Sequence, residues 1–276
     1  MTGPLPAPRP AAAGTHPERA RSALDAVTAA LPHTSLDDVL AVAALQTRVD
    51  RKYLVPAEDL PRLGCALAGT HRVLQIGNRR VFGYESVYFD TDGLALYRQH
   101  LQGRRRRYKV RTRTYLDTDA TMFEVKLKGR RGQTVKQRLP YAVADRHVIS
   151  PRARAFLDAL LMAEYGEHAP ELGASVTTTY SRATLVDLAG GSRLTLDVDL
   201  VCTGRTRRAA PDGHVLVETK AVGRGGPADR VLAGLGLRAL SVSKYCVGVA
   251  LLHPDLPANP WHRTLCRHFG YAGAEG

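Results

Sequence analysis

Residues 108–115 read Tyr108-Lys109-Val110-Arg111-Thr112-Arg113-Thr114-Tyr115, and the prediction of the fold class rests first on this stretch. Three cations occupy every second position among residues that favour β-strands. Because successive side chains of a strand point to opposite faces, Lys109, Arg111 and Arg113 form one row. The stretch therefore predicts a strand with one cationic face, which in a single strand is more often a solvated surface than a binding site.

The same alternation recurs in four other predicted strands, over residues 45–55, 122–128, 193–201 and 215–221. In each of them one row is largely apolar and the other is charged. The charged rows hold, in chain order, Arg48, Asp50 and Lys52; Glu124, Lys126 and Lys128; Arg193, Asp197 and Asp199; and Glu218 and Lys220. Both signs of charge are therefore expected on one face of a common sheet.

Two architectures fit this alternation. In the first, the apolar rows build the core of a sandwich and the charged rows face water as ordinary salt-bridged surface. In the second, the sheet closes into a barrel whose charged rows point inward around an anionic ligand. General frequencies of charged strand faces favour the sandwich. Helices with apolar stripes, which must cover something, favour the barrel.

The remaining elements indicate one domain. Helices are predicted over about residues 17–31, 56–69 and 151–165, with a short helix from residue 227 and an apolar segment over 247–252. Further strands are predicted over 82–90 and 176–186. Seven or so strands with few helices argue against a doubly wound parallel sheet. Residues 1–16, rich in Pro, Ala and Gly, predict a disordered leader before a single domain over residues 17–276.

Composition indicates an anionic partner. Lys and Arg total 39 against 26 acids, for a formal net charge of +13, which suits a phosphate polymer, a nucleotide, a nucleic acid or an acidic membrane. An aromatic content of 6%, without clustering beside the arginines, argues against a general nucleic-acid binder. Four scattered cysteines without CxxC spacing argue against a disulfide scaffold or a zinc site. The chain lacks a bilayer-length apolar run and the order of a signal peptide, which predicts a cytoplasmic protein.

Ten short motifs, in order from about residue 45 to 252, resemble the VTC domain. This is the polyphosphate polymerase domain of the vacuolar transporter chaperone complex, within the triphosphate tunnel metalloenzyme (CYTH-like) superfamily. The motifs are DRKYLV (50–55), SVYFDT (86–91), YxxH (97–100), RYKVRTRTY (107–115), FEVK (123–126), VKQR (135–138), YSR (180–182), RLTLD (193–197), ETK (218–220) and SKY (243–245). Each motif is weak alone, but their order makes the resemblance specific.

The resemblance implies an α+β fold, with a closed antiparallel barrel of eight strands and helices packed outside it. Charged rows then line a tunnel that binds the phosphates of ATP, and a divalent metal, Mn²⁺ preferred or Mg²⁺, bridges them. The implied activity is transfer of the terminal phosphoryl group to inorganic polyphosphate. Alternatives are hydrolysis of tripolyphosphate or nucleoside triphosphates, and non-catalytic sensing of polyphosphate or inositol phosphates.

By position, the resemblance implies three groups of site residues. The catalytic phosphate ligands would be Lys52, Arg111, Arg113, Lys126, Arg182, Arg193 and Lys244. Further phosphate-binding residues would be Lys136, Lys109, Lys220 and Tyr180. The metal would be bound by Glu218, with Glu124 and Asp50 as weaker candidates. The alternative role of each charged residue is an ion pair in the barrel wall. Glu218 separates enzyme from sensor, because a purely binding tunnel needs no metal carboxylate.

One departure from the superfamily concerns its opening motif, ExExK. Here the corresponding row is Arg48, Asp50 and Lys52, so a cation replaces the first acid. The change suits polyphosphate or nucleotide phosphates better than chemistry in which acids hold two metals. Since the chain has no extended apolar segment, we expect it to work in the cytoplasm or to dock on a membrane partner; the sequence leaves the oligomeric state open.

Overall fold

The computed structural model describes residues 16–44, 48–129, 133–205, 207–209, 214–223 and 225–271. The helices are α1 (His16–Ala30), α2 (Leu36–Ala44), α3 (Leu60–Leu67), α4 (Ala95–Leu101), α5 (Pro151–Tyr165), α6 (Pro227–Gly234), α7 (Lys244–Leu252) and α8 (His262–Phe269), with 3-10 turns η1 (Ala57–Asp59) and η2 (Val143–Asp145). Apart from His16, the predicted leader lies outside the described residues.

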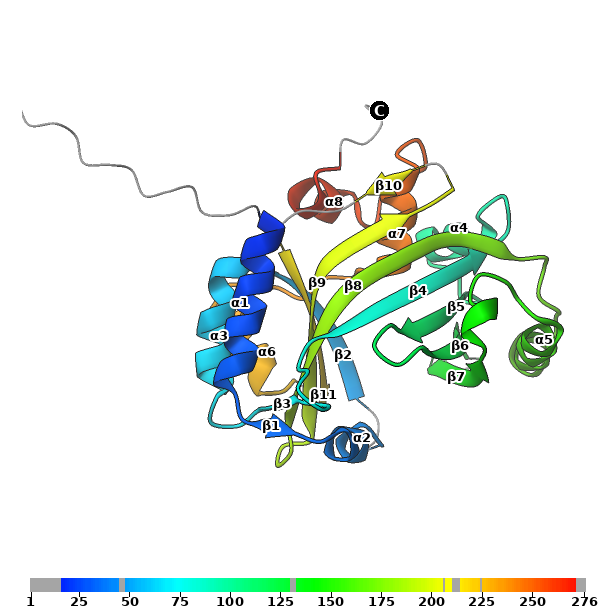
Figure 1. The fold of residues 1–276 in the computed structure, drawn as a ribbon. Coiled ribbons are helices and arrows are strands. Elements are labelled where there is room, and N and C mark those ends of the chain that lie inside the picture. Colours follow the sequence, from blue (N-terminus) through cyan, green and yellow to red (C-terminus); the bar gives the residue numbers. More distant parts are fainter. Residues whose placement is uncertain are drawn as a thin grey trace, which may run out of the picture.

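A single large sheet contains all the strands (Figure 1). They are β1 (His33–Thr34), β2 (Arg48–Pro56), β3 (Arg72–Leu74), β4 (Phe82–Asp90), β5 (Tyr108–Tyr115), β6 (Ala120–Lys128), β7 (Thr134–Tyr141), β8 (Gly173–Asp187), β9 (Ser192–Thr203), β10 (Arg208–Ala209) and β11 (His214–Val222). Its main path runs β2-β11-β9-β8-β4-β5-β6-β7 with antiparallel neighbours. The predicted α+β class is confirmed.

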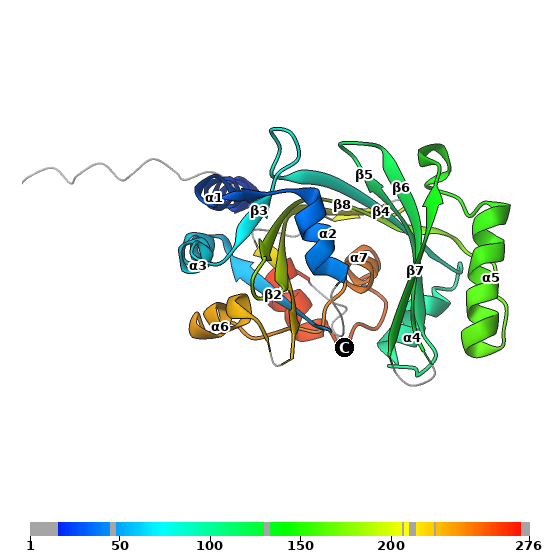
Figure 2. The same cartoon turned by 90° about the horizontal axis from the view of Figure 1, so that it is seen from below.

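Helices cover the convex face of this curved sheet. On one side α1, α3 and α6 pack over the apolar rows of β2, β9 and β11, where Tyr53, Leu196 and Val217 are buried. On the other side α5 buries Leu157 against Val110 of β5 and its neighbours in β6. The charged rows consequently lie on the concave face (Figure 2). This orientation is that of the second architecture, with charge inside the curve and helices over the apolar rows.

The predicted closure of the barrel is wrong. The path of strands begins at β2 and ends at β7, and no pairing joins these two edges within the described ranges. Helix α7 lies inside the curve of the sheet (Figure 2), where its residues share one buried cluster with Leu54, Val176 and Leu216. An eight-stranded barrel has an interior just wide enough for its own side chains. A helix in that space therefore requires an open sheet.

Most predicted elements are present. The strand over 82–90 and the helix over 151–165 have the predicted bounds. The predicted helix over 56–69 begins as the η1 turn and continues as α3. Residues 45–47 of the first predicted strand lie outside the described residues, and the rest of it forms β2. No helix in the described part of the chain has both the length and the apolar character to cross a membrane.

Candidate functional site

The predicted site residues lie on three parts of the concave face. Those on strands belong to the inward row of their strand, because that row alternates with the buried convex row. Lys244 is the first residue of α7, inside the curve. Arg193 is directly opposite Lys220 in the register of β9 and β11. The structure thus gathers the predicted residues on one surface, and all but Lys109, Lys126 and Arg193 lie in or beside three charged clusters.

The first cluster, here the Glu124 cluster, consists of Glu124, Arg111, Arg113 and Lys136. Arg111 donates to Glu124 Oε2 through Nε and Nη2 at 2.8 and 2.6 Å. Lys136 Nζ donates to Oε1 at 2.7 Å, and Arg113 Nε is 4.0 Å from Oε2. Burial alone would raise the pKa of Glu124, but Arg111, Arg113 and Lys136 together hold it well below its usual range. Three cations share one carboxylate, so positive charge remains in excess.

The second cluster, here the Asp197 cluster, joins β8, β9 and α7. Arg182 donates to the two carboxylate oxygens of Asp197 at 2.5 and 2.8 Å, and Lys244 Nζ contacts Oδ2 of the same group. Burial would raise the pKa of Asp197, but Arg182 and Lys244 outweigh it and lower that pKa. Tyr180 lies beside both cations, with Lys244 Nζ 4.2 Å and the Arg182 guanidinium 5.2 Å from its ring centre.

The third cluster, here the Glu218 cluster, consists of Asp50, Lys52, Glu218 and Lys220. In the pairing of β2 with β11, Glu218 is opposite Lys52 and Lys220 is opposite Asp50. Lys220 Nζ donates to Glu218 Oε1 at 2.5 Å and to Asp50 Oδ2 at 2.8 Å. Burial would raise the pKa of Glu218, but Lys220 and then Lys52 hold it well below the usual range. Glu218 is therefore ionised and can serve as a hard oxygen ligand.

Three lysines face the interior without a carboxylate partner. Among the described residues, the side chains of Lys52, Lys109 and Lys126 make no hydrogen bond or ion pair. Lys109 and Lys126 are directly opposite each other in β5 and β6. Burial, reinforced by Lys126, Lys52 and Arg111, lowers the pKa of Lys109 to about 8. Burial, reinforced by the charge of Lys52, also lowers the pKa of Lys126. A bound polyanion would relieve this repulsion.

Buried polar atoms without partners lie on the same face. They are Ser86 Oγ, Thr178 Oγ1, Tyr180 OH, Thr195 Oγ1 and Arg113 Nε, none of which has a hydrogen bond within the described residues. Ser86 of β4 is directly opposite both Thr178 and Arg113. Because buried polar groups are normally hydrogen-bonded, such a row requires an explanation. Oxygen atoms of a bound anion, or ordered water, would supply the missing partners.

The carboxylates provide a limited metal site. No group of three or more His, Cys, Asp and Glu side chains within the described ranges could hold a metal ion. Asp50 and Glu218, held together by Lys220, could supply two oxygen ligands, which is typical of Mg²⁺ sites completed by phosphate oxygens and water. These two residues therefore fit a metal that binds with the substrate. Glu124 belongs to a different cluster, where three cations occupy its carboxylate.

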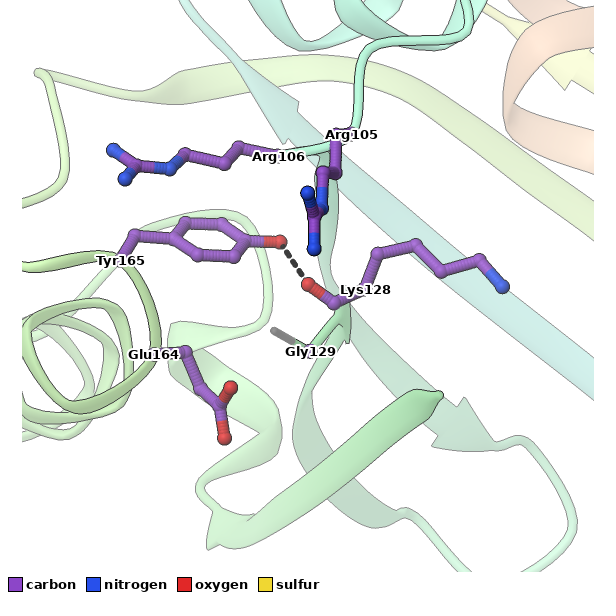
Figure 3. Close-up of a pocket in the computed structure, with 6 residues that line it drawn as sticks. All are labelled: Arg105, Arg106, Lys128, Gly129, Glu164 and Tyr165. Carbon is purple, nitrogen blue, oxygen red and sulfur yellow. Dashed lines mark hydrogen bonds between the residues drawn. The ribbon is translucent and has the colours of Figure 1, made fainter. Parts of the chain in front are cut away.

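A separate cavity of about 610 Å³ lies beside α5, outside the concave face. It is lined by Arg105, Arg106, Lys128, Gly129, Glu164 and Tyr165 (Figure 3). Tyr165 OH donates to Lys128 O at 2.7 Å at its edge. Glu164 is an acidic residue in this lining, so the cavity is less suited to a polyanion than the concave face.

Sequence reasoning missed several residues of the site. The sequence places Asp197 in a charged row and in the RLTLD motif, but it does not predict that Asp197 pairs with both Arg182 and Lys244. The role of Tyr88 was also missed: its hydroxyl accepts a hydrogen bond from Arg111 Nη1 at 3.0 Å. Tyr84 was missed as well, although its ring lies 5.1 Å from the Arg182 guanidinium. The motifs RLTLD and SVYFDT contain two of these residues, but only strand register and the place of α7 reveal the contacts.

Comparisons with solved structures find distant similarities. A putative adenylate cyclase from Vibrio parahaemolyticus is 14% identical, with 72% of this chain and 95% of that chain covered and a TM-score of 0.40. A putative adenylyl cyclase from Hippeastrum, described as having a dominant triphosphatase activity, is 15% identical, with 73% and 95% covered and a TM-score of 0.45. The PH1012 protein from Pyrococcus horikoshii is 14% identical, with 70% and 92% covered and a TM-score of 0.36.

No curated protein matches the sequence. The sequence model of one protein family, described as the VTC domain, matches residues 47–253, which is well over half of the chain. The matched region begins just before β2 and ends just after α7, so it contains all three charged clusters. The chain belongs to the VTC domain family.

Proposed function

We propose that the concave face binds a triphosphate and transfers its terminal phosphoryl group, with ATP as donor and inorganic polyphosphate as acceptor and product. The observation that carries this proposal is the excess of cations around two carboxylates that can hold a metal, in a member of the VTC domain family. Phosphoryl transfer depends mainly on in-line positioning and on neutralising the charge of the transferring oxygens. A surface of Arg and Lys side chains suits that requirement.

The clusters suggest a division of roles. Arg111 and Arg113 project from the same face of β5 and both approach the carboxylate of Glu124, so together they could contact the oxygens of one triphosphate. Glu124 and Asp197 hold their arginines in fixed orientations, which reduces reorganisation when charge develops on the phosphoryl oxygens. Lys109 and Lys126 would attract the more distant part of the chain. A divalent ion, Mn²⁺ or Mg²⁺, held by Glu218 and Asp50 would supply further neutralisation of the phosphate oxygens.

Two other functions are supported by particular observations. Within the described residues the edges of β2 and β7 do not pair with each other, so the sheet is open, which favours hydrolysis if water reaches the phosphoryl group. Lys220 bridges the two carboxylates and neutralises part of their charge without a metal. A face that needs no metal favours a sensor of polyphosphate or inositol phosphates. Action in the cytoplasm is a proposal that follows from the sequence, and docking on a membrane partner is a proposal that follows from the family.

Incubation of the purified protein with ATP and Mn²⁺ tests the proposal. We expect ADP together with phosphate chains that are resolved by gel electrophoresis. Glu218→Gln should abolish turnover while most tripolyphosphate binding is retained, because the cations remain. Glu85→Gln is a matched control, since Glu85 pairs with Arg146 away from the three clusters. Release of inorganic phosphate without chains would identify a hydrolase, and the absence of any product would favour the sensor.

A further inference from the structure

Lys220 occupies the space between the two carboxylates of the Glu218 cluster. Its side chain turns back along β11 to Glu218 Oε1 at 2.5 Å and across to Asp50 Oδ2 of β2 at 2.8 Å. Only 15% of the Lys220 side chain is exposed, against 21% for Glu218 and 32% for Asp50. One ammonium group therefore joins two oxygen ligands from neighbouring strands, as a bridging cation would.

The choice of Lys220 for this contact is selective. Lys52 is directly opposite Glu218, yet its side chain makes no ion pair or hydrogen bond within the described part of the chain. Positive charge is abundant nearby, since Lys126 interacts with Lys52 and with both carboxylates. The two carboxylates thus share the Lys220 ammonium by direct hydrogen bonds, while the side chains of Lys52 and Lys126 stay available to a ligand.

We propose that Lys220 is an internal counter-ion for the metal site: it holds Asp50 and Glu218 in the metal-free protein, and an incoming divalent cation displaces it. The inference rests on the proposed function. A lysine side chain has a flexible four-carbon stem and a compact charge, so the displaced ammonium can turn toward the phosphates. Metal and triphosphate would then each favour binding of the other, because the metal releases the Lys220 ammonium from the carboxylates and the triphosphate binds that ammonium.

The counter-ion is tested by Mn²⁺ binding to the full-length protein without nucleotide, followed by the electron paramagnetic resonance signal of free Mn²⁺. Lys220→Met should bind Mn²⁺ about tenfold more tightly than the wild type, because the metal no longer competes with charge-assisted hydrogen bonds. Addition of tripolyphosphate should strengthen Mn²⁺ binding more in the wild type than in Lys220→Met.

Lys136→Met is a matched control. It also removes a lysine that donates to a carboxylate of the concave face, Glu124 at 2.7 Å, and it should leave Mn²⁺ affinity near the wild-type value. Lys220→Arg retains the charge, and it should likewise stay near wild type. Equal tightening by Lys136→Met would indicate a general effect of charge and overturn the inference. So would unchanged affinity in Lys220→Met, provided that its melting temperature shows a folded protein.

Failure of this inference is distinguishable from failure of the proposed function. Turnover of ATP by the wild type, together with unchanged Mn²⁺ affinity in Lys220→Met, would reject the counter-ion and retain the phosphoryl transferase. Tighter Mn²⁺ binding in Lys220→Met, without turnover by the wild type, would reject the transferase and retain the counter-ion. If Lys220→Met does not fold, Lys220→Gln is measured in its place, and the same tenfold tightening is expected.

Discussion

The carboxylates of the concave face differ in how completely they are occupied. Glu124 receives donors from Arg111 and Lys136, and its side chain is only 3% exposed. Asp197 is likewise fixed between Arg182 and Lys244. Both act as anchors that orient cations. Asp50 and Glu218 share the ammonium of Lys220 and are more exposed, at 32% and 21%, so we propose that they are the pair that changes partners when a metal and phosphates arrive.

Lys109 should make phosphate binding sensitive to pH. Burial lowers the pKa of Lys109 to about 8, so its ammonium is charged at pH 7 and mostly neutral at pH 9. A bound anion favours the charged form; affinity for tripolyphosphate is therefore lost as the pH rises through 8. The wild type should lose up to about tenfold in affinity between pH 7 and pH 9 relative to Lys109→Arg, measured by titration calorimetry.

Lys109→Arg is a suitable reference because arginine stays charged throughout that range. Burial and the nearby arginines also lower the pKa of Lys136 to about 8. Because Lys136 is present in both proteins, its effect cancels in the ratio of wild-type affinity to Lys109→Arg affinity. Parallel pH profiles of the wild type and Lys109→Arg would show that Lys109 does not face the bound anion.

Side-chain rows were predictable from the sequence, whereas contacts between rows were not. Period-two alternation places Lys109, Arg111 and Arg113 together whatever the fold. The bond from Arg111 to Glu124 depends on the register of β5 with β6, which alternation leaves open. The three-residue metal group that the resemblance implied is divided between two clusters, with Glu124 apart from Asp50 and Glu218.

Helix α7 connects the site to the core. Ser243 caps it by accepting from Cys246 N at 3.1 Å, and the next two residues hold buried carboxylates. Lys244 contacts Asp197 of β9, while Tyr245 OH donates to Asp90 at the end of β4. Asp90 also accepts from the backbone N–H of Leu96 at 2.8 Å, so α4 and α7 share one anchor. The SKY motif thus explains why α7 stays inside the curve.

Removal of this anchor should loosen α7 in particular. Tyr245→Phe leaves Asp90 buried with one donor fewer, and we expect the free energy of unfolding to fall by about 2 kcal/mol in urea denaturation. Amide hydrogen exchange at residues 244–252 should accelerate more than exchange in β4. Tyr271→Phe is the control, because Tyr271 OH donates to Pro254 O at 3.1 Å, outside α7. Equal acceleration in both variants would contradict an anchoring role for Tyr245.

Helices and strands were predictable where the apolar residues of a segment followed a single periodicity. The strand over 82–90 and the helix over 151–165 have clear apolar periodicity and boundary residues, and both have the predicted bounds. Strand β7 was not predicted, because it exposes Lys136, Gln137 and Arg138 in succession and contains Pro140. Such a sequence suits an edge strand, which needs no pairing on its outer side.

For the protein as a whole, the fold class was predictable and closure of the sheet was not. The alternating rows and the VTC resemblance indicate a curved antiparallel sheet with charge inside. Closure depends on whether anything else enters the curve. The segment 247–252 looked only like an apolar run, but Val247, Val249 and Leu252 pack on the concave face together with Leu54. This placement, which is tertiary, keeps the edges of β2 and β7 apart.

The central claim is that the concave face, rather than the basic surface in general, binds the triphosphate. Titration calorimetry with tripolyphosphate on Arg113→Gln and Arg104→Gln tests it most directly. Arg113 points into the site with a buried Nε that has no hydrogen bond among the described residues. Arg104, in contrast, is exposed, and its Nε donates to the nearby side chain of Gln102 at 2.8 Å. We expect Arg113→Gln to weaken binding by about tenfold or more and Arg104→Gln to stay within about twofold. Equal losses in the two variants would contradict the claim.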